Sequence, residues 1–189
     1  ENLLKCWGEN IVNVLGLSAN LNLSTVPTII DSSEKYLKVS ASHKKSCAIT
    51  VAGKMKCWGA YNSGTLGVSG NGTTDDVQKP TIIDPNENYK DVVVSGGNTC
   101  ALTTSGDIKC WGTNRNGEVG NGTNIRQLLP LLVDSGTKYK QVALIDSDVT
   151  EGFACGVTVH GKIKCWGSNE YHVFSVNFPA DQRHYFPTH

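Results

Sequence analysis

The chain has 189 residues and balances 17 basic against 17 acidic side chains. This length is sufficient for one domain with a hydrophobic core. Balanced charge without a basic stripe disfavours a nucleic-acid binder, and the lack of about 18 consecutive apolar residues argues against membrane insertion. The N-terminus carries no signal peptide, so we expect a mature product or an excised domain.

One tetrapeptide, Lys-Cys-Trp-Gly, recurs four times and contains all 4 tryptophans of the chain. Its cysteines follow one another at intervals of 51, 53 and 55 residues, and the repeats start near residues 5, 56, 109 and 164. Self-similarity at a period of this length indicates a repeat architecture.

In chain order, each of the first three repeats continues with a turn, a Pro-led apolar run, a β-rich stretch and a hairpin. The turns are Asn13–Gly16, Gly64–Gly67 and Gly117–Gly120; the apolar runs are 26–31, 79–84 and 129–134; the β-rich stretches are 36–40, 89–95 and 139–144. The apolar runs are short and β-branched, and no window has a helical period. Four short strands per unit predict an all-β protein made of propeller blades. The fourth copy stops early, after Gly167.

The hairpins place six of the seven cysteines in three pairs, each ten residues apart. The pairs are Cys47 with Cys57, Cys100 with Cys110, and Cys155 with Cys165. We expect the hairpins to close at Thr50:Lys54, Thr103:Asp107 and Thr158:Lys162, which leaves a three-residue loop that ends in Gly, the residue best suited to a left-handed position. This register puts cysteine opposite cysteine at a non-hydrogen-bonded site, where a disulfide is feasible.

Two alternatives to disulfides stay open, and Cys6 is a separate case. The cysteines could be reduced and buried; a zinc site is disfavoured because the spacing is not Cys-x-x-Cys and no His recurs with the pairs. Disulfides would place the protein outside the cytosol, in the extracellular space, at the cell surface or in the periplasm. Cys6 has no hairpin partner, which favours a chain excised from a longer array over an interchain bridge.

The segment Ser95–Gly122 resembles the repeat of the regulator-of-chromosome-condensation (RCC1-like) family, and Ser42–Thr50 is a second match that keeps the family histidine at His43. With its paired cysteines, the chain looks like the bacterial secreted or surface branch. The resemblance implies four-stranded blades of a seven-bladed β-propeller. We therefore assign 1–175 to an array of about three and a half repeats, a partial or oligomer-completed ring. Residues 176–189 would form a divergent tail that caps an end or contributes an interface.

Few residues suggest catalysis. The five histidines do not recur with an acid and a nucleophile. We interpret Asp75–Asp76 as a solvated pair rather than a metal site, and the tryptophans as blade scaffold. The prediction is a protein without enzymatic activity, metal or cofactor.

Function in a propeller is expected on the loops, because the scaffold itself is generic. The loops that differ between copies supply the candidate binding residues Asn71, Asp75, Asp76, Arg126, Gln127, Asp146, Asp148 and Glu151. The predicted function is a non-catalytic extracellular recognition or adhesion module that binds a protein or glycan, with a homo-oligomer as one way to close the ring. The resemblance also suggests two alternatives, a secreted protein inhibitor of an enzyme and, less favoured, an intracellular nucleotide-exchange factor.

Overall fold

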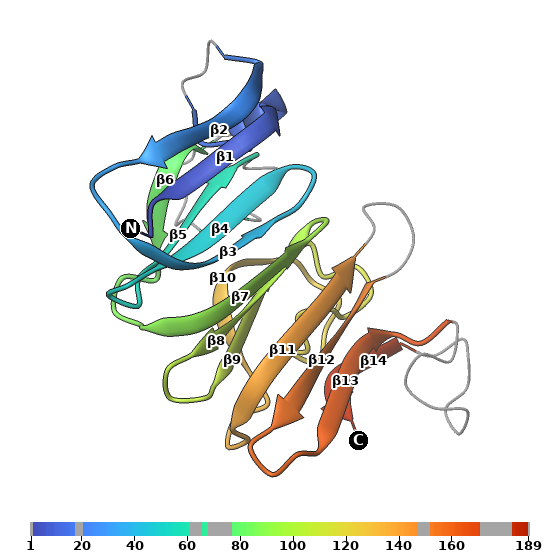
Figure 1. Ribbon diagram of the computed structural model, residues 1–189. Helices are drawn as coiled ribbons and strands as arrows, with labels where there is room; N and C mark the ends of the chain where they lie inside the picture. The colour runs from blue at the N-terminus through green and yellow to red at the C-terminus, as the bar shows by residue number, and fades with distance from the viewer. Residues whose placement is uncertain are drawn as a thin grey trace.

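The computed structural model of the chain describes residues 2–17, 21–60, 66–67, 77–146, 152–170 and 183–188. Within these residues the chain forms four antiparallel sheets and one short 3-10 helix. Figure 1 shows the sheets following one another in chain order, with the N-terminus in the first sheet and the C-terminus in the last. The all-β prediction is confirmed.

The sheets have two, four, four and four strands. The first contains β1 (Leu4–Glu9) and β2 (Leu23–Asp31), with the 3-10 helix η1 (Ile11–Asn13) between them. The second contains β3 (Tyr36–Ala41), β4 (Lys45–Thr50), β5 (Met55–Gly59) and β6 (Val77–Ile83). The third contains β7 (Tyr89–Ser95), β8 (Asn98–Thr103), β9 (Ile108–Gly112) and β10 (Gln127–Val133). The fourth contains β11 (Tyr139–Asp146), β12 (Gly152–Thr158), β13 (Ile163–Ser168) and β14 (Arg183–Thr188).

The strand order explains where the prolines stand. The inner strands β3, β7 and β11 contact their neighbours across the seams between sheets. The outer strands β2, β6, β10 and β14 each pair on one side only among the described residues. Proline lacks a backbone donor and is therefore restricted to edge strands. The prolines of these four strands are Pro27, Pro80, Pro130 and Pro187.

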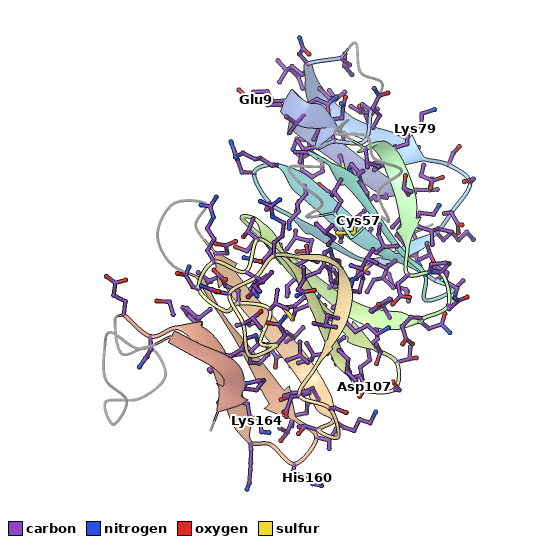
Figure 2. All side chains as sticks on the ribbon, turned by 180° about the vertical axis from the view of Figure 1, so that it is seen from behind. Glu9, Cys57, Lys79, Asp107, His160 and Lys164 are labelled. Carbon is purple, nitrogen blue, oxygen red and sulfur yellow. A yellow bond between two sulfur atoms is a disulfide. The ribbon has the colours of Figure 1, made fainter. Side chains whose placement is uncertain are left out.

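The hairpin register is the predicted one in all three copies. The closing hydrogen bonds run from Thr50, Thr103 and Thr158 N to the carbonyls of Lys54, Asp107 and Lys162, at 2.8, 2.9 and 2.8 Å. The structure contains the disulfides Cys47–Cys57, Cys100–Cys110 and Cys155–Cys165, and Cys6 is a free thiol. The interpretation of these six as reduced thiols or zinc ligands is therefore wrong. Figure 2 shows the sulfur atoms at Cys57 inside the molecule, whereas Asp107 and His160 mark hairpin tips.

Residues of the predicted tail form a strand. β14 pairs with β13, and Thr188 lies opposite Cys165 just as Thr81 lies opposite Cys57. The fourth repeat therefore has an outer strand in the same register as the second. The boundary predicted at residue 175 lies outside the described residues.

Each buried tryptophan lies against the turn of the preceding repeat. Trp166 is fully buried, and its Nε1 donates to Glu118 O at 2.7 Å. Gly120 of the same turn has a φ of +72°, and a Cβ there would come within 2.7 Å of the Trp166 indole. Glycine is required because the position is both left-handed and in contact with the ring. The same contact joins Gly16 to Trp58 and Gly67 to Trp111.

A second repeated contact, the Tyr–Asp–Lys clasp, closes each seam at the hairpin end. Asp84 directly follows the outer strand β6. Its Oδ2 accepts hydrogen bonds from Tyr89 Oη at 2.8 Å and Lys109 Nζ at 2.7 Å, and both donors belong to the next sheet. Burial opposes ionisation, but these two donors hold the pKa of Asp84 below its usual value. The other two clasps are Asp31 with Tyr36 and Lys56, and Asp134 with Tyr139 and Lys164.

Candidate functional site

The loops that vary between repeats lie at one end of the sheets, which we call the loop end. Gly112 at the end of β9 pairs with both Asn98 and Gln127, so the β7–β8 turn and loop 113–126 emerge together. Asp146 at the end of β11 contacts the β7–β8 turn from the next sheet. Three candidate residues, Arg126, Gln127 and Asp146, therefore lie at the loop end. The opposite end carries the hairpin tips and the clasps.

Asp146 joins two sheets. Its Oδ2 accepts from Gly97 N and from Asn98 Nδ2, both at 2.8 Å. Its backbone N donates to Ser95 Oγ at 2.9 Å, and Ser95 Oγ donates to Asp146 O at 3.1 Å. Two of these four bonds involve the side chain and two the backbone, so Asp146 organises the seam through both; a role in ligand binding stays a prediction.

A buried asparagine organises loop 113–126. Asn114 Nδ2 donates to the carbonyls of Thr123 and Ile125 at 3.1 and 2.8 Å, and its Oδ1 accepts from Val119 N at 3.0 Å. Asn114 also has a φ of +55°, which asparagine tolerates better than most residues. One side chain thus fixes both ends of the loop that presents Arg126, and a preorganised loop loses less entropy on binding.

A buried acidic side chain within the same loop also holds it in place. Glu118 is 1% exposed and accepts hydrogen bonds from Asn116 N and Nδ2 at 2.8 and 2.9 Å. Burial raises the pKa of this carboxyl above its usual value. A Cβ on Gly152 would lie 2.4 Å from Glu118 Oε1, so the glycine makes room for the carboxylate between two sheets.

Exposed apolar side chains at the loop end flank Arg126. Ile125, Leu128 and Leu129 are 66, 48 and 49% exposed. Arg126 is exposed, and Gln127 is half-buried where it pairs with Gly112. We call Ile125–Leu129 the β10 rim. Exposed aliphatic residues beside arginine on a rigid strand are typical of a protein-binding surface.

Five candidate binding residues lie outside the described residues: Asn71, Asp75, Asp76, Asp148 and Glu151. Their assignment to the binding surface stays a prediction. Within the described part of the chain, no group of three or more His, Cys, Asp or Glu side chains is arranged to hold a metal ion. The described residues also include no helix long and apolar enough to span a bilayer.

Sequence reasoning missed the asparagines that hold the loops. Asn10 repeats the role of Asn114 in the first repeat: its Nδ2 donates to Leu21 O at 2.7 Å and its Oδ1 accepts from Leu15 N at 2.9 Å. The signal was present in the sequence, because an asparagine follows the tetrapeptide by two residues at Asn10, Asn114 and Asn169.

Comparison with known proteins finds that the sequence of this chain is similar to one family of repeats. The model of the regulator of chromosome condensation (RCC1) repeat matches residues 89–118. The human E3 ubiquitin-protein ligase HERC2 is 28% identical over 179 residues, which cover 90% of this chain and 4% of HERC2. Protein pim1 of Schizosaccharomyces pombe is 29% identical over 156 residues, which cover 73% of this chain and 29% of pim1. The chain thus spans less than a third of either relative.

Two solved structures share the fold. Yeast RCC1 (Prp20), solved in complex with Kap60, aligns with a TM-score of 0.80 and 21% identity, over 99% of this chain and 44% of that one. Human WBSCR16 aligns with a TM-score of 0.78 and 17% identity, over 99% of this chain and 48% of that one. The chain therefore folds as RCC1-type propeller blades, and its sequence is similar to that of proteins with RCC1 repeats.

Proposed function

We propose that this RCC1-type segment is a non-catalytic recognition module that acts outside the reducing cytosol and binds a protein through the β10 rim. The observation that carries the proposal is the exposed aliphatic and arginine surface on a loop held by Asn114. A related structure supports a protein ligand, because yeast Prp20 was solved bound to Kap60 and also binds Gsp1p and histones. A glycan is the alternative ligand.

The three disulfides support the extracellular, cell-surface or periplasmic location. Each crosses one hairpin at the same register. The four cysteines of the second and third sheets are fully buried, and the two of the fourth sheet are half-buried. Disulfides of this kind persist in oxidising compartments and are rare in the cytosol. Protein purified without reductant and then unfolded in denaturant with iodoacetamide should carry one alkylated cysteine, Cys6, and reduction should expose the other six. Alkylation of all 7 cysteines in the unreduced protein would contradict the proposed location.

The ligand proposal is tested on an array of purified secreted and cell-surface ectodomains, printed beside a glycan array. The probe is the labelled chain, and the test variant is Ile125→Asp with Leu129→Asp. Val26→Asp is the matched control, because Val26 is 62% exposed and lies on β2, away from the β10 rim. We expect at least one ectodomain to bind the parent and the control, with a loss of about tenfold or more for the rim variant.

Two results would count against this proposal. Ectodomain binding that survives the rim double variant would place the ligand elsewhere on the molecule. Binding confined to glycans would support the alternative ligand class. Both variants change exposed side chains, so unchanged thermal unfolding is the check that neither has lost its fold.

A further inference from the structure

A groove of about 520 Å³ lies beside β1. Its walls include Lys5, Cys6 and Trp7 of β1, and Val39 of β3. Successive residues of a strand point to opposite faces, so a groove lined by three in a row follows the strand edge. β1 pairs only with β2 among the described residues, and the other edge of β1 is the one along the groove. Figure 2 places Glu9, which also lines it, at the far end of the molecule from His160.

The other three sheets show what occupies this position. β5, β9 and β13 correspond to β1, and each pairs with a strand that carries a cysteine directly opposite its own. Cys6 has the same register toward the outer strand as Cys57, since Cys6 lies opposite Thr28 and Cys57 lies opposite Thr81. The groove is therefore the place of a cysteine-bearing strand equivalent to β4, β8 and β12.

Exposure of the groove residues supports the same conclusion. Trp7 is 60% exposed, whereas Trp58, Trp111 and Trp166 are fully buried. Val39 of β3 is 47% exposed, but the equivalent Val92 of β7 is fully buried against the hairpin disulfide Cys47–Cys57 of the preceding sheet. The groove thus corresponds to the seam between two adjacent sheets, but its apolar wall is uncovered.

We propose that this groove binds a β-hairpin of the chain's own repeat type, supplied by another polypeptide segment, whose second strand pairs with β1 and places a cysteine opposite Cys6. The internal pairs define the chemistry of that strand. It carries a small residue opposite Trp7, as Ser46 and Thr99 lie opposite Trp58 and Trp111. It carries an apolar residue opposite Leu4, where the copies have Ile49 opposite Met55. This site is separate from the β10 rim.

The covalent step is a thiol–disulfide exchange. Cys6 loses its proton to solvent, and its thiolate attacks the hairpin cysteine, which arrives as a mixed disulfide with a small thiol. The new bond joins the two cysteines, and the small thiol leaves with the electron pair of the broken bond. Burial raises the pKa of Cys6 to about 11, so its thiolate is scarce at neutral pH and attack on an undocked disulfide is slow. Docking overcomes this by raising the local concentration of the partner.

The test uses the whole chain and a synthetic peptide of residues 89–103, which contains β7, β8 and the single cysteine Cys100. The peptide cysteine is activated as a 2-thiopyridyl disulfide, so release of thiopyridone reports each exchange. We expect the rate to saturate with peptide concentration. At about 10 μM it should exceed the rate for a scrambled peptide with the same cysteine by about a hundredfold, because docking supplies a roughly millimolar effective concentration.

Two variants locate the reaction. Val39→Lys should slow the exchange about tenfold, because it removes an apolar contact from the groove wall. Val26→Lys on β2, where the side chain is 62% exposed, should leave the rate unchanged. Cys6→Ser should form no adduct, and a peptide with Cys100→Ser should still bind and shift the emission of Trp7 to shorter wavelength.

Three results would overturn the proposal. If a scrambled peptide reacts as fast as the 89–103 peptide, Cys6 reacts because it is accessible and no docking of the hairpin is needed. A rate insensitive to Val39→Lys would place docking outside the groove. A Cys6–Cys6 dimer formed in preference to the peptide adduct would mean that a second copy of the chain occupies the site.

Discussion

At the scale of single residues, the Tyr–Asp–Lys clasp couples stability to pH. The Asp84 and Lys109 side chains are 23 and 20% exposed and lie 2.7 Å apart, so their interaction is stronger than that of a pair in open solvent. Burial works against the charge of Asp84, yet the bonds from Lys109 and Tyr89 lower its pKa. A carboxyl with a lowered folded pKa contributes stability above its unfolded value near 4, and that stability is lost as the pH falls through the folded value.

We therefore expect Asp84→Asn to lower the free energy of unfolding at pH 7 by about 1–2 kcal/mol. The difference from the parent should shrink as the pH falls below about 4, because the unfolded parent then takes up a proton that the folded parent takes up only at lower pH. Denaturant unfolding at pH 7 and pH 3 measures both values. Asp91→Asn, which breaks the more exposed pair with Lys38 at 2.9 Å, should cost less than about 1 kcal/mol. A constant difference across this range would refute the assignment of the clasp as the titrating contact.

At the scale of elements, the glycine that lies against each buried tryptophan must adopt a positive φ and must leave room for the indole ring. A comparison of two glycines separates these two requirements. Gly120 and Gly161 both have positive φ, +72° and +81°. A Cβ on Gly120 meets the buried Trp166, whereas a Cβ on Gly161 meets nothing within 4 Å. Gly161→Ala should thus cost about 1–2 kcal/mol for the backbone alone. Gly120→Ala should cost about 1–3 kcal/mol more from overpacking, which urea unfolding midpoints would reveal. Equal losses would show that the tryptophan contact is irrelevant.

The hairpin disulfides make a second element-scale prediction. Replacing Cys100 and Cys110 by alanine opens a loop of sequence separation 10, and loop entropy assigns such a closure about 3 kcal/mol. The double variant should therefore unfold at lower denaturant than the parent, and reductant should move the parent toward the variant. Cys6→Ala is the control, because Cys6 closes no loop. A double variant as stable as the parent would mean that the bond adds nothing beyond packing.

At the scale of the whole molecule, closure of the ring by a second copy would change both the mass and the exposure of Trp7. In the single chain, Trp7 is the one tryptophan with a largely exposed side chain. We expect acrylamide to quench about one of the 4 tryptophans wherever light scattering reports a mass near 20.3 kDa, and Trp7→Phe to abolish that fraction. Ring closure that covers the β1 groove would double the mass and protect Trp7 together. A doubled mass with Trp7 still quenchable would place the dimer contact elsewhere.

The sequence by itself determined the features whose cause is local. A three-residue loop with glycine in its last position sets hairpin register, so Cys47 and Cys57 could be paired without knowledge of the fold. The repeat period likewise predicted four-stranded blades, because each copy contains the same succession of short strands and turns. The edge position of Pro27 and its equivalents follows from the missing backbone donor.

Only the tertiary structure decided the contacts between repeats. Asp84 and Lys109 meet because stacked sheets bring an outer-strand end against the next tetrapeptide, and Asp146 points into a seam although its loop varies in sequence. β14 pairs with β13 across a long connection whose length no local rule sets. The tetrapeptide also occurs in two environments: Trp7 and Trp166 have the same sequence context, but Trp7 is exposed and Trp166 is buried. Burial depends on what packs against a residue, and that is a property of neighbouring sheets rather than of the local sequence.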